Sequence, residues 1–173
     1  MRQEQLDELM QHVAIVPTTM AHVDDILEID QLSFQNCYSE QVVTDKIRKQ
    51  LDPGDQSSKY DRAMSCVSLT NGDVLGFMLA GFHRSRHDNE ARLGKSQLTI
   101  SRLAVHPSTR WRYIGTQLVE TAITMADDAK ATSVQIGVNC DDVSVGSLIF
   151  LERMLFTLSA TVGVLNLYER RLI

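Results

Sequence analysis

The most specific pattern of the chain runs from Leu98 to Ala129 and reads LTISRLAVHP (98–107), STRWRYIG (108–115) and TQLVETAITMADDA (116–129). The first part is rich in aliphatic and β-branched residues and ends at Pro107, which predicts a strand. The third part is rich in helix-forming residues. A strand that passes through a short turn into a helix start leaves unpaired backbone N–H groups facing one point, so the pattern predicts a pocket for phosphate oxygens.

The turn itself carries two arginines, Arg110 and Arg112, which would add positive charge to such a pocket. A diphosphate needs several N–H donors and the positive end of a helix dipole, worth about 0.3–1 kcal/mol for each favourable charge at an exposed helix terminus. Basic strand–turn–helix units are also common without any ligand. The turn alone therefore leaves a phosphate site and a purely structural turn equally open.

The same stretch resembles motif A of the GNAT acyltransferase superfamily, in which a strand ending near V-x-P precedes Q/R-x-x-G-x-G/A and a helix. The matching residues are Val105, Pro107, Arg110, Gly115 and Leu118. In that family the turn amides hold the pyrophosphate of acetyl-coenzyme A, and the strand splays from its neighbour so that its backbone can pair with the pantetheine arm. The resemblance implies acetyl-CoA as cosubstrate, bound by Leu103, Ala104, Val105, Arg110, Trp111, Arg112, Tyr113, Ile114, Gly115 and Thr116.

The turn departs from the motif at one glycine. When Arg110 is aligned with the Q/R of the motif, Tyr113 occupies the first glycine and Gly115 the second. Glycine permits a close approach to phosphates and a positive φ, whereas a bulky residue held in the left-handed conformation costs on the order of 1–2 kcal/mol. Two alternatives are open: the backbone at Tyr113 stays in an ordinary conformation, or coenzyme A binding is weakened.

The composition is that of a soluble globular protein, with 173 residues of which 43% are hydrophobic and 23% charged. We expect a single domain over residues 1–173, in which residues 1–12 form an additional N-terminal helix. Apolar runs stay well short of the ~20 residues that span a membrane, and the N-terminus has no signal-peptide core, so a cytoplasmic protein without a membrane partner is expected. The net charge of −5 argues against a nucleic-acid partner and is compatible with a cationic amine acceptor.

Cysteine and histidine usage does not predict a disulfide framework or a metal site. Cys37, Cys66 and Cys140 are odd in number and widely spaced, which indicates reduced thiols that more often serve as small hydrophobes than as nucleophiles. His83 and His87 are four residues apart, but they fall in a charged stretch that we expect to be a solvated loop. We therefore predict no metal cofactor.

Outside the motif, strands and helices alternate along the chain. A helix capped by Thr18 or Thr19 is expected to run to Asp30, a second helix to begin near Ser39, and Asn71-Gly72 between β-rich runs predicts a hairpin. The order β-α-α-β-β-β-α-β-α-β resembles the GNAT fold, which implies an α/β protein with a mixed, mostly antiparallel central sheet flanked by helices. The exposed closing strand, with alternating apolar residues, would be able to pair across a homodimer.

The region between the first two helices resembles the ribosomal-protein alanine N-acetyltransferase type of GNAT protein. In that type the first helix ends in an aromatic residue and is followed by W/Y-S-E, and here Phe34, Tyr38, Ser39 and Glu40 match. The resemblance implies that Phe34 and Tyr38 help to bind the acceptor. The alternative is that both aromatic side chains only anchor the loop on the core.

The residues for proton transfer match the family least. Acetyl transfer to an amine requires a deprotonated amine, a donor to the carbonyl oxygen and often an acid for the departing thiolate. Many GNAT proteins carry a Glu on the motif strand, where this chain has Thr99, and a Tyr acid in a later N-x-x-A-x-x-x-Y-x-x-x-G-F signature. Counting back from Phe156, Leu155 replaces the Gly and Leu151 replaces the Tyr. We expect these leucines to extend core packing with Leu148.

Three side chains are candidates for the missing roles. Tyr168 and Ser144 offer hydroxyl groups, and Ser144 takes the place of the Asn in the later signature, as Ser147 takes that of the Ala. His106 is the third candidate because histidine is a residue type that serves as a general base, but its position usually faces outward in the family. The catalytic residue is therefore not assigned from the sequence.

Two functions follow from these patterns. The first is an N-acyltransferase that moves acetyl from acetyl-CoA directly to a primary amine, either a protein α-amine or a small molecule, and that relies mainly on holding the reactants together. The second is a catalytically weakened GNAT-fold module that binds coenzyme A or a protein partner without efficient turnover. Loss of the motif residues at Tyr113 and Leu151 favours the second, and the retained Arg110 and Gly115 favour the first.

Overall fold

The computed structural model describes residues 13–34, 37–51, 62–84, 96–110, 113–141 and 144–172. The helix expected over residues 1–12 lies outside these ranges, as do His87, Trp111 and Arg112. Among the described residues, no helix has both the length and the apolar character needed to cross a membrane.

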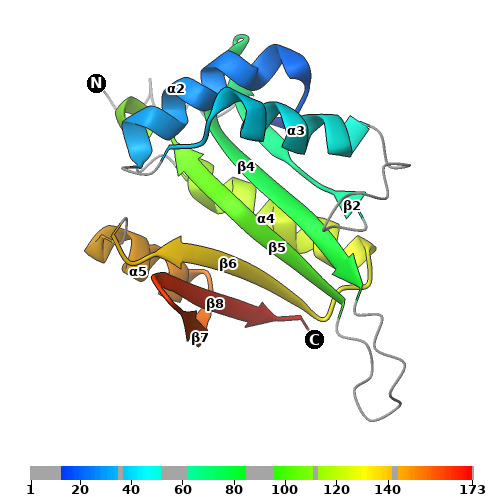
Figure 1. Cartoon of the computed structure of the whole chain (residues 1–173), viewed down its shortest axis with the longest axis vertical. Helices are drawn as coiled ribbons and strands as arrows, with labels where there is room; N and C mark the ends of the chain where they lie inside the picture. The colour runs from blue at the N-terminus through cyan, green and yellow to red at the C-terminus, as the bar shows by residue number, and fades with distance from the viewer. Residues whose placement is uncertain are drawn as a thin grey trace.

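A twisted mixed sheet forms the centre of the molecule (Figure 1). Its strand order is β1-β3-β4-β5-β6-β8-β7, and every neighbouring pair is antiparallel except β5 and β6. The short strand β2 pairs with β4 outside this path. The strands are β1 (Ala14–Pro17), β2 (Arg62–Ala63), β3 (Cys66–Thr70), β4 (Asp73–Arg84), β5 (Ser96–Val105), β6 (Ser133–Asn139), β7 (Thr157–Val162) and β8 (Leu165–Arg171).

Helices cover both faces of the sheet. In Figure 1, α2 (Val23–Ser33) and α3 (Glu40–Leu51) lie on one face over β4 and β5, while α4 (Ile114–Asp128) lies on the other. The helix α5 (Val145–Arg153) packs beside α4 on that second face, against β6 and β8. Each face has its own apolar core, with Ile26, Ile29, Val43, Ile47, Phe77 and Leu79 on the α2–α3 side and Leu98, Ile100, Leu118, Ala122, Ile136 and Leu151 on the α4–α5 side.

Several local predictions are confirmed. Asn71 and Gly72 both have positive φ, 51° and 91°, and join β3 to β4 in a hairpin. The helix α3 follows Ser39, whose Oγ accepts a hydrogen bond from the Val42 N–H at 3.4 Å. The first helix differs at both ends. Thr19 is an N-cap, but of a 3-10 turn, Met20–His22, that leads into α2, and α2 ends at Ser33 rather than at Asp30.

Three expectations about single residues and edges are wrong. Leu151 is buried, but Leu148 is 38% exposed and Leu155 68%. Leu155 has a φ of 63°, because it takes the left-handed position that ends α5. His83 lies in β4 and is half-buried rather than in a solvated loop. The closing strand β8 is not an edge, since it pairs with β6 on one side and β7 on the other. The exposed edge on that side is β7, whose six residues are all exposed.

The ends of α4 and α5 share one geometry. The N–H of Leu155 bonds to the Glu152 carbonyl and the N–H of Phe156 to the Leu151 carbonyl, both at 2.9 Å. Lys130, with a φ of 58°, and Ala131 make the same pair of bonds at the end of α4. This is the usual C-terminal motif in which glycine is favoured, so the replacement of glycine by leucine at position 155 leaves the backbone path intact at an energetic cost.

Candidate functional site

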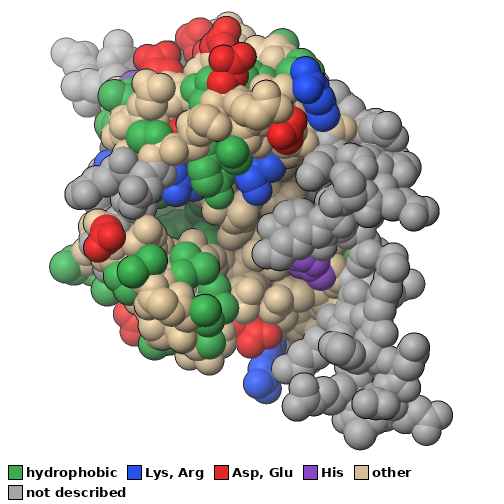
Figure 2. All heavy atoms as spheres, in the orientation of Figure 1, with side chains coloured by type: hydrophobic (Ala, Val, Ile, Leu, Met, Phe, Trp, Pro, Cys, Tyr) green, Lys and Arg blue, Asp and Glu red, His purple; other side chains and the backbone are tan. Residues whose placement is uncertain are grey.

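Strands β5 and β6 separate along their length. Their parallel pairing covers only four positions, from Gln97 opposite Ser133 to Ile100 opposite Ile136, although β5 continues to Val105 and β6 to Asn139. In Figure 1 the two arrowheads diverge toward the start of α4, and Figure 2 shows the molecular surface hollowed between the α2–α3 side and the β6–β8 side. We call this opening between the two strands the splay.

Polar backbone groups at the end of β5 face the splay. The His106 N–H donates to the Leu75 carbonyl of β4 at 2.8 Å, and Gly76 is the register partner of Val105. Because successive residues of a strand turn their N–H and C=O groups to opposite sides, Val105 and Leu103 direct theirs away from β4 and into the splay. A ligand lying along β5 would therefore find strand-like donors and acceptors.

The start of α4 lies at the wide end of the splay. Tyr113, the residue before the helix, has φ 60° and ψ 2°, so the backbone adopts the left-handed conformation that the motif glycine would adopt. This excludes the first of the two alternatives open at Tyr113, an ordinary backbone conformation. Its side chain is 73% exposed, and no side chain caps the helix start in the described part of the chain. The first-turn N–H groups of α4 are thus available to an anion.

Gly115 belongs to the first turn of α4 and is half-buried. A Cβ added there would lie 3.6 Å from Phe150 Cζ and 3.6 Å from Val105 Cγ2, which is ordinary contact. The glycine therefore keeps open the narrow space between α4, α5 and β5. A methyl group fits this space, whereas a larger branched side chain would fill it.

Arg110 lies on the α2 side of the splay and is exposed. Its Nε donates to the Val105 carbonyl at 3.3 Å and its Nη2 to Ser33 Oγ at 3.2 Å. Ser33 is the last residue of α2. The guanidinium therefore bridges the end of β5 and the end of α2, close to the start of α4.

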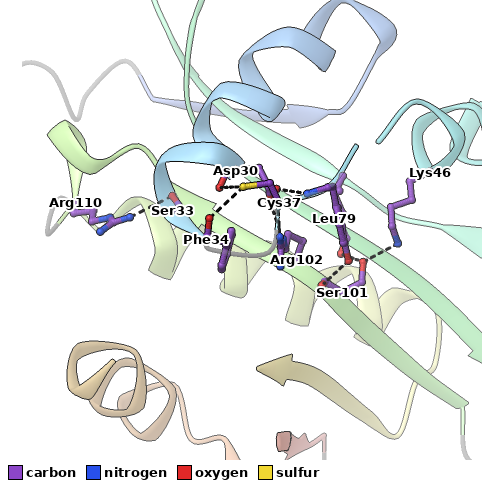
Figure 3. A network of polar contacts seen from close by, with 10 residues as sticks. Asp30, Ser33, Phe34, Cys37, Lys46, Leu79, Ser101, Arg102 and Arg110 are labelled. Atoms are coloured by element: carbon purple, nitrogen blue, oxygen red, sulfur yellow. Dashed lines mark hydrogen bonds and ion pairs between the residues drawn. The ribbon is translucent and has the colours of Figure 1, made fainter. Parts of the chain in front are cut away.

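A buried ion pair joins α2 to β5. Arg102 Nε donates to Asp30 Oδ1 at 2.7 Å and Arg102 Nη2 to Asp30 Oδ2 at 3.3 Å, and the two side chains are only 11% and 1% exposed. The second carboxylate oxygen also accepts the Tyr38 N–H at 2.6 Å. Figure 3 shows Arg110, Arg102 and Lys46 in a row on the α2 and α3 side of β5, with Asp30 above Arg102 and Phe34 beside it.

Both aromatic residues of the predicted acceptor region contact Arg102. The guanidinium carbon lies 3.9 Å from the centre of the Phe34 ring and 4.3 Å from that of Tyr38. Lys46 Nζ is 5.5 Å from the Tyr38 ring centre. Both rings also pack against the apolar core on the α2–α3 side, as the second sequence alternative expected, and the contact with the Arg102 guanidinium is an addition that the sequence did not indicate.

Tyr38 also reaches β5 directly. Its hydroxyl donates to the Ser101 carbonyl at 3.3 Å, while Lys46 Nζ donates to Ser101 Oγ at 3.1 Å. Burial is the main cause that raises the pKa of Tyr38, and the positive charge of Arg102 opposes it. The phenol is therefore protonated at neutral pH and acts as a donor.

The three candidates for proton transfer lie in different surroundings. Ser144 is the N-cap of α5, where its Oγ accepts the Ser147 N–H at 3.1 Å. Tyr168 packs against the apolar core on the α4–α5 side of the sheet. His106 Nδ1 lies 2.7 Å from Ser108 Oγ, in a recess with Asp25, Glu28 and Asp73 beside the start of α2. The structure does not bring these three side chains together with Tyr38.

One polar row was missed by the sequence analysis. Thr99 is the register partner of Gln135 on β6, which is in turn the partner of Glu169 on β8. Their neighbours Ile100, Ile136 and Tyr168 face the α4–α5 core, so this row faces the opposite, α2–α3 side. It crosses the sheet next to the narrow end of the splay. The carboxylate of Glu169 is thus on the same face as Thr99, although β8 is the last strand of the chain.

The three thiols differ in their surroundings. Cys66 lies in β3 and is fully buried, and this burial raises the pKa of its thiol to about 12. Cys37 and Cys140 are exposed, and Cys37 Sγ donates to the Phe34 carbonyl at 3.2 Å. Within the described ranges, no group of three or more metal-binding side chains converges.

The profile of the acetyltransferase (GNAT) family matches residues 23–170, which include the splay, the start of α4 and the α2–α3 region. The chain belongs to the GNAT acetyltransferase family. Acetyl-CoA is the usual acyl donor of GNAT enzymes. A comparison with curated proteins found no significant match.

Solved structures of GNAT proteins share this fold at low sequence identity. Ard1 from Thermoplasma volcanium aligns with a TM-score of 0.69 and 17% identity, over 93% of this chain and 98% of its own. The ribosomal-protein alanine N-acetyltransferase from Escherichia coli gives 0.64 and 13%, over 91% and 90% of the two chains. Arabidopsis thaliana Naa50, in complex with the bisubstrate analogue CoA-Ac-MVNAL, gives 0.65 and 13%, over 92% and 99%. The predicted α/β GNAT fold is confirmed.

Proposed function

We propose that this GNAT protein binds acetyl-CoA along the splay and transfers the acetyl group directly to a primary amine. The observation that carries the proposal is the backbone of Leu103 and the Val105 N–H, which face the splay and lead into the start of α4, where no side chain caps the described residues. The pantetheine amides would pair with this backbone as an added strand would, and the pyrophosphate would meet the N–H groups of the first helical turn. Arg110 would supply a positive charge to the phosphates.

The remaining residues of the proposed cofactor site follow from the same placement. Tyr113, Ile114, Gly115 and Thr116 form the helix start, and Leu103, Ala104 and Val105 form the facing strand. Trp111 and Arg112 are included from the sequence pattern alone, because they lie outside the described residues. We place the whole site in the single domain proposed for residues 1–173, which is supported by the fact that every described strand belongs to one sheet.

We propose a peptide α-amine as the acceptor, as in the ribosomal-protein alanine N-acetyltransferase type. Two features support this class: the aromatic and Ser-Glu pattern at Phe34, Tyr38, Ser39 and Glu40, and the similarity to structures whose names include a peptide substrate or analogue. The acceptor would enter from the α2–α3 side of the sheet, between Tyr38 and the β6–β8 strands. The amine would then attack the thioester at the narrow end of the splay.

We assign the removal of the amine proton to Glu169, acting through a water molecule. Thr99 has no basic group at neutral pH, whereas Glu169 presents a carboxylate on the same face in the same row. Glu169 takes one proton from the ammonium through the water molecule, and the resulting neutral amine attacks the thioester carbonyl carbon. The C–S bond breaks as the C–N bond forms, and the second proton of the nitrogen passes to the departing thiolate, which leaves as the free thiol of coenzyme A. The Tyr38 hydroxyl donates a hydrogen bond to the Ser101 carbonyl and is protonated at neutral pH, so it is not available as the base.

Replacement of Glu169 by Gln tests this assignment. We expect kcat to fall by about 10²-fold or more, because general base catalysis contributes that much, while the affinity for coenzyme A stays the same. A matched control is Glu152→Gln, which removes an exposed carboxylate from α5. Equal activity of wild-type protein and the Glu169→Gln variant across pH 6–9 would show that the carboxylate has no part in proton transfer.

Calorimetric titration with acetyl-CoA and with coenzyme A tests the proposed cofactor site. We expect micromolar binding, together with slower hydrogen exchange at the amides of residues 110–116 and 101–105 in the bound state. The absence of binding at millimolar ligand would refute the proposal and leave the catalytically weakened module as the alternative. Binding with unchanged exchange at these amides would place the ligand elsewhere on the molecule.

A further inference from the structure

We propose that Arg102 is a positioning residue for acetyl transfer, which fixes the α2–α3 segment that receives the acceptor against the part of β5 that receives the cofactor. This inference rests on the proposed function. It concerns a side chain that contacts neither reactant and that is not one of the motif residues quoted above.

The ion pair between Arg102 and Asp30 fixes one relative position of β5 and α2 and adds little to the net stability of the fold. Removing both charges from water is costly, and a buried pair contributes little overall compared with apolar residues of the same volume. Here the pair is bidentate, and Asp30 also accepts the Tyr38 N–H at 2.6 Å. The carboxylate thus ties the segment after α2 to the same guanidinium that extends from β5.

The flat guanidinium also orders the two aromatic rings. Its carbon is 3.9 Å from the Phe34 ring centre and 4.3 Å from the Tyr38 ring centre. Arginine stacks on rings and pairs with a carboxylate at the same time, whereas the ammonium of lysine is a point charge without a plane. One side chain therefore sets both ends of the segment from Phe34 to Tyr38.

A bulge in β5 makes this contact possible. Leu79 pairs with Arg102 and Ala80 with Ile100, so Ser101 is an extra residue on β5. As a result, Ser101 and Arg102 both turn to the α2–α3 side, where Ser101 meets Tyr38 and Lys46. The bulge directly follows Ile100, the last residue of β5 that pairs with β6. The network therefore acts at the narrow end of the splay, where the thioester of a bound cofactor would lie.

A substitution of Arg102 should impair the binding of the acceptor without impairing the binding of the cofactor. An attacking amine must come within about 3–3.5 Å of the thioester carbon, so a small shift of the α2–α3 segment is enough to lose productive geometry. The cofactor contacts proposed above use the backbone of β5 and the start of α4, which do not depend on Asp30. Loss of Arg102 should then raise the acceptor KM and leave the Kd of coenzyme A nearly unchanged.

The experiment compares Arg102→Lys with the double variant Asp30→Asn/Arg102→Met. Lysine keeps the positive charge but loses the pair of hydrogen bonds to the Asp30 carboxylate and the stacking on the Phe34 and Tyr38 rings. The double variant removes both buried charges, while the introduced asparagine retains an oxygen for the Tyr38 N–H. The matched control is Arg170→Lys, since Arg170 donates to the Met154 carbonyl on the opposite face of the sheet. The measurements are thermal unfolding, the Kd of coenzyme A, and kcat and KM with the peptide or other primary amine that wild-type protein acetylates fastest from a fixed panel.

We expect Arg102→Lys and the double variant both to raise the acceptor KM at least tenfold, with less than a twofold change in the Kd of coenzyme A. The double variant should regain most of the thermal stability that Arg102→Lys loses, without regaining the native KM. A native KM in the stable double variant would overturn the proposal, because a purely structural pair would account for it. Failure of wild-type protein to bind coenzyme A or to acetylate any amine would overturn the proposed function first, and this inference with it.

Discussion

Three residues of this GNAT protein hold a left-handed backbone without glycine at helix ends. Tyr113 precedes α4, Lys130 follows it, and Leu155 follows α5, with φ values of 60°, 58° and 63°. Tyr113 and Leu155 stand where the family favours glycine. Tertiary contacts therefore impose the conformation that these positions need, and the side chains bear an energetic cost for it.

Glycine at either position should stabilise the protein. We expect Tyr113→Gly and Leu155→Gly each to raise the free energy of unfolding by about 1 kcal/mol, since the Cβ strain disappears and both side chains are largely exposed. Urea denaturation measures the effect, and Ala129→Gly, at a residue with a φ of −80°, serves as the control that should not stabilise.

Tyr113→Gly should also tighten coenzyme A binding. An unchanged or weaker affinity would mean that the proposed phosphate site accommodates or uses the ring.

The buried thiol predicts a specific pH dependence. Burial raises the pKa of Cys66 to about 12, so the unfolded chain loses this proton at lower pH than the folded chain. The stabilisation is complete below pH 9 and declines as the pH rises toward 12. The stability difference between wild-type protein and Cys66→Ala should therefore shrink by on the order of 1 kcal/mol between pH 8 and 10. A constant difference would show that the thiol ionises equally in both states.

At the scale of elements, the junction of β5 and α4 depends on two glycines with different roles. Gly76 lets β4 and β5 approach, because an added Cβ would lie 2.9 Å from the Ala104 carbonyl oxygen. Gly115 leaves free space beside Phe150 and Val105 instead. The first glycine serves the fold, and the second serves the proposed site.

Substitutions should separate these roles. We expect Gly115→Val to weaken coenzyme A binding more than tenfold with a native-like unfolding transition, because the added methyl groups enter the proposed site. Gly115→Ala is the control that should bind normally, whereas Gly76→Ala should destabilise the protein by about 1–3 kcal/mol. Calorimetry and thermal unfolding measure both quantities. Normal binding by Gly115→Val would argue against a ligand at the start of α4.

At the scale of the whole molecule, two halves of the sheet meet at a short ladder. Strands β1 to β5 carry α2 and α3, and β6 to β8 carry α5, while only four residue pairs join β5 to β6. The helix α4 packs across this junction. A ligand in the splay would therefore touch both halves.

Bound coenzyme A should therefore stabilise both halves of the sheet together. At a ligand concentration one hundred times Kd, the free energy of unfolding should rise by about 2.7 kcal/mol. Hydrogen exchange should slow on both sides of the splay, at residues 101–105 of β5 and at residues 137–139 of β6. Protection confined to the start of α4 would mean that the ligand does not enter the splay.

Short-range patterns were sufficient for much of this architecture. The strand, turn and helix around Pro107, the hairpin at Asn71-Gly72 and the start of α3 after Ser39 depend on residues only a few positions apart, and each was predicted. The family resemblance followed from the same local motif. The resemblance also pointed to the splay, because in the GNAT family the motif strand separates from its neighbouring strand.

Long-range geometry was beyond the sequence. The Arg102–Asp30 pair joins residues 72 positions apart, and the Ser101 bulge that turns Arg102 toward Asp30 follows from pairing between β4 and β5. The row from Thr99 to Glu169 exists only because β8 returns to lie beside β6. Likewise, the left-handed backbone at Tyr113 and Leu155 runs against local preference, since packing of the complete helices outweighs a cost of about 1–2 kcal/mol at a single residue. Local composition therefore defined the elements, and the contacts between distant elements decided how the site is assembled.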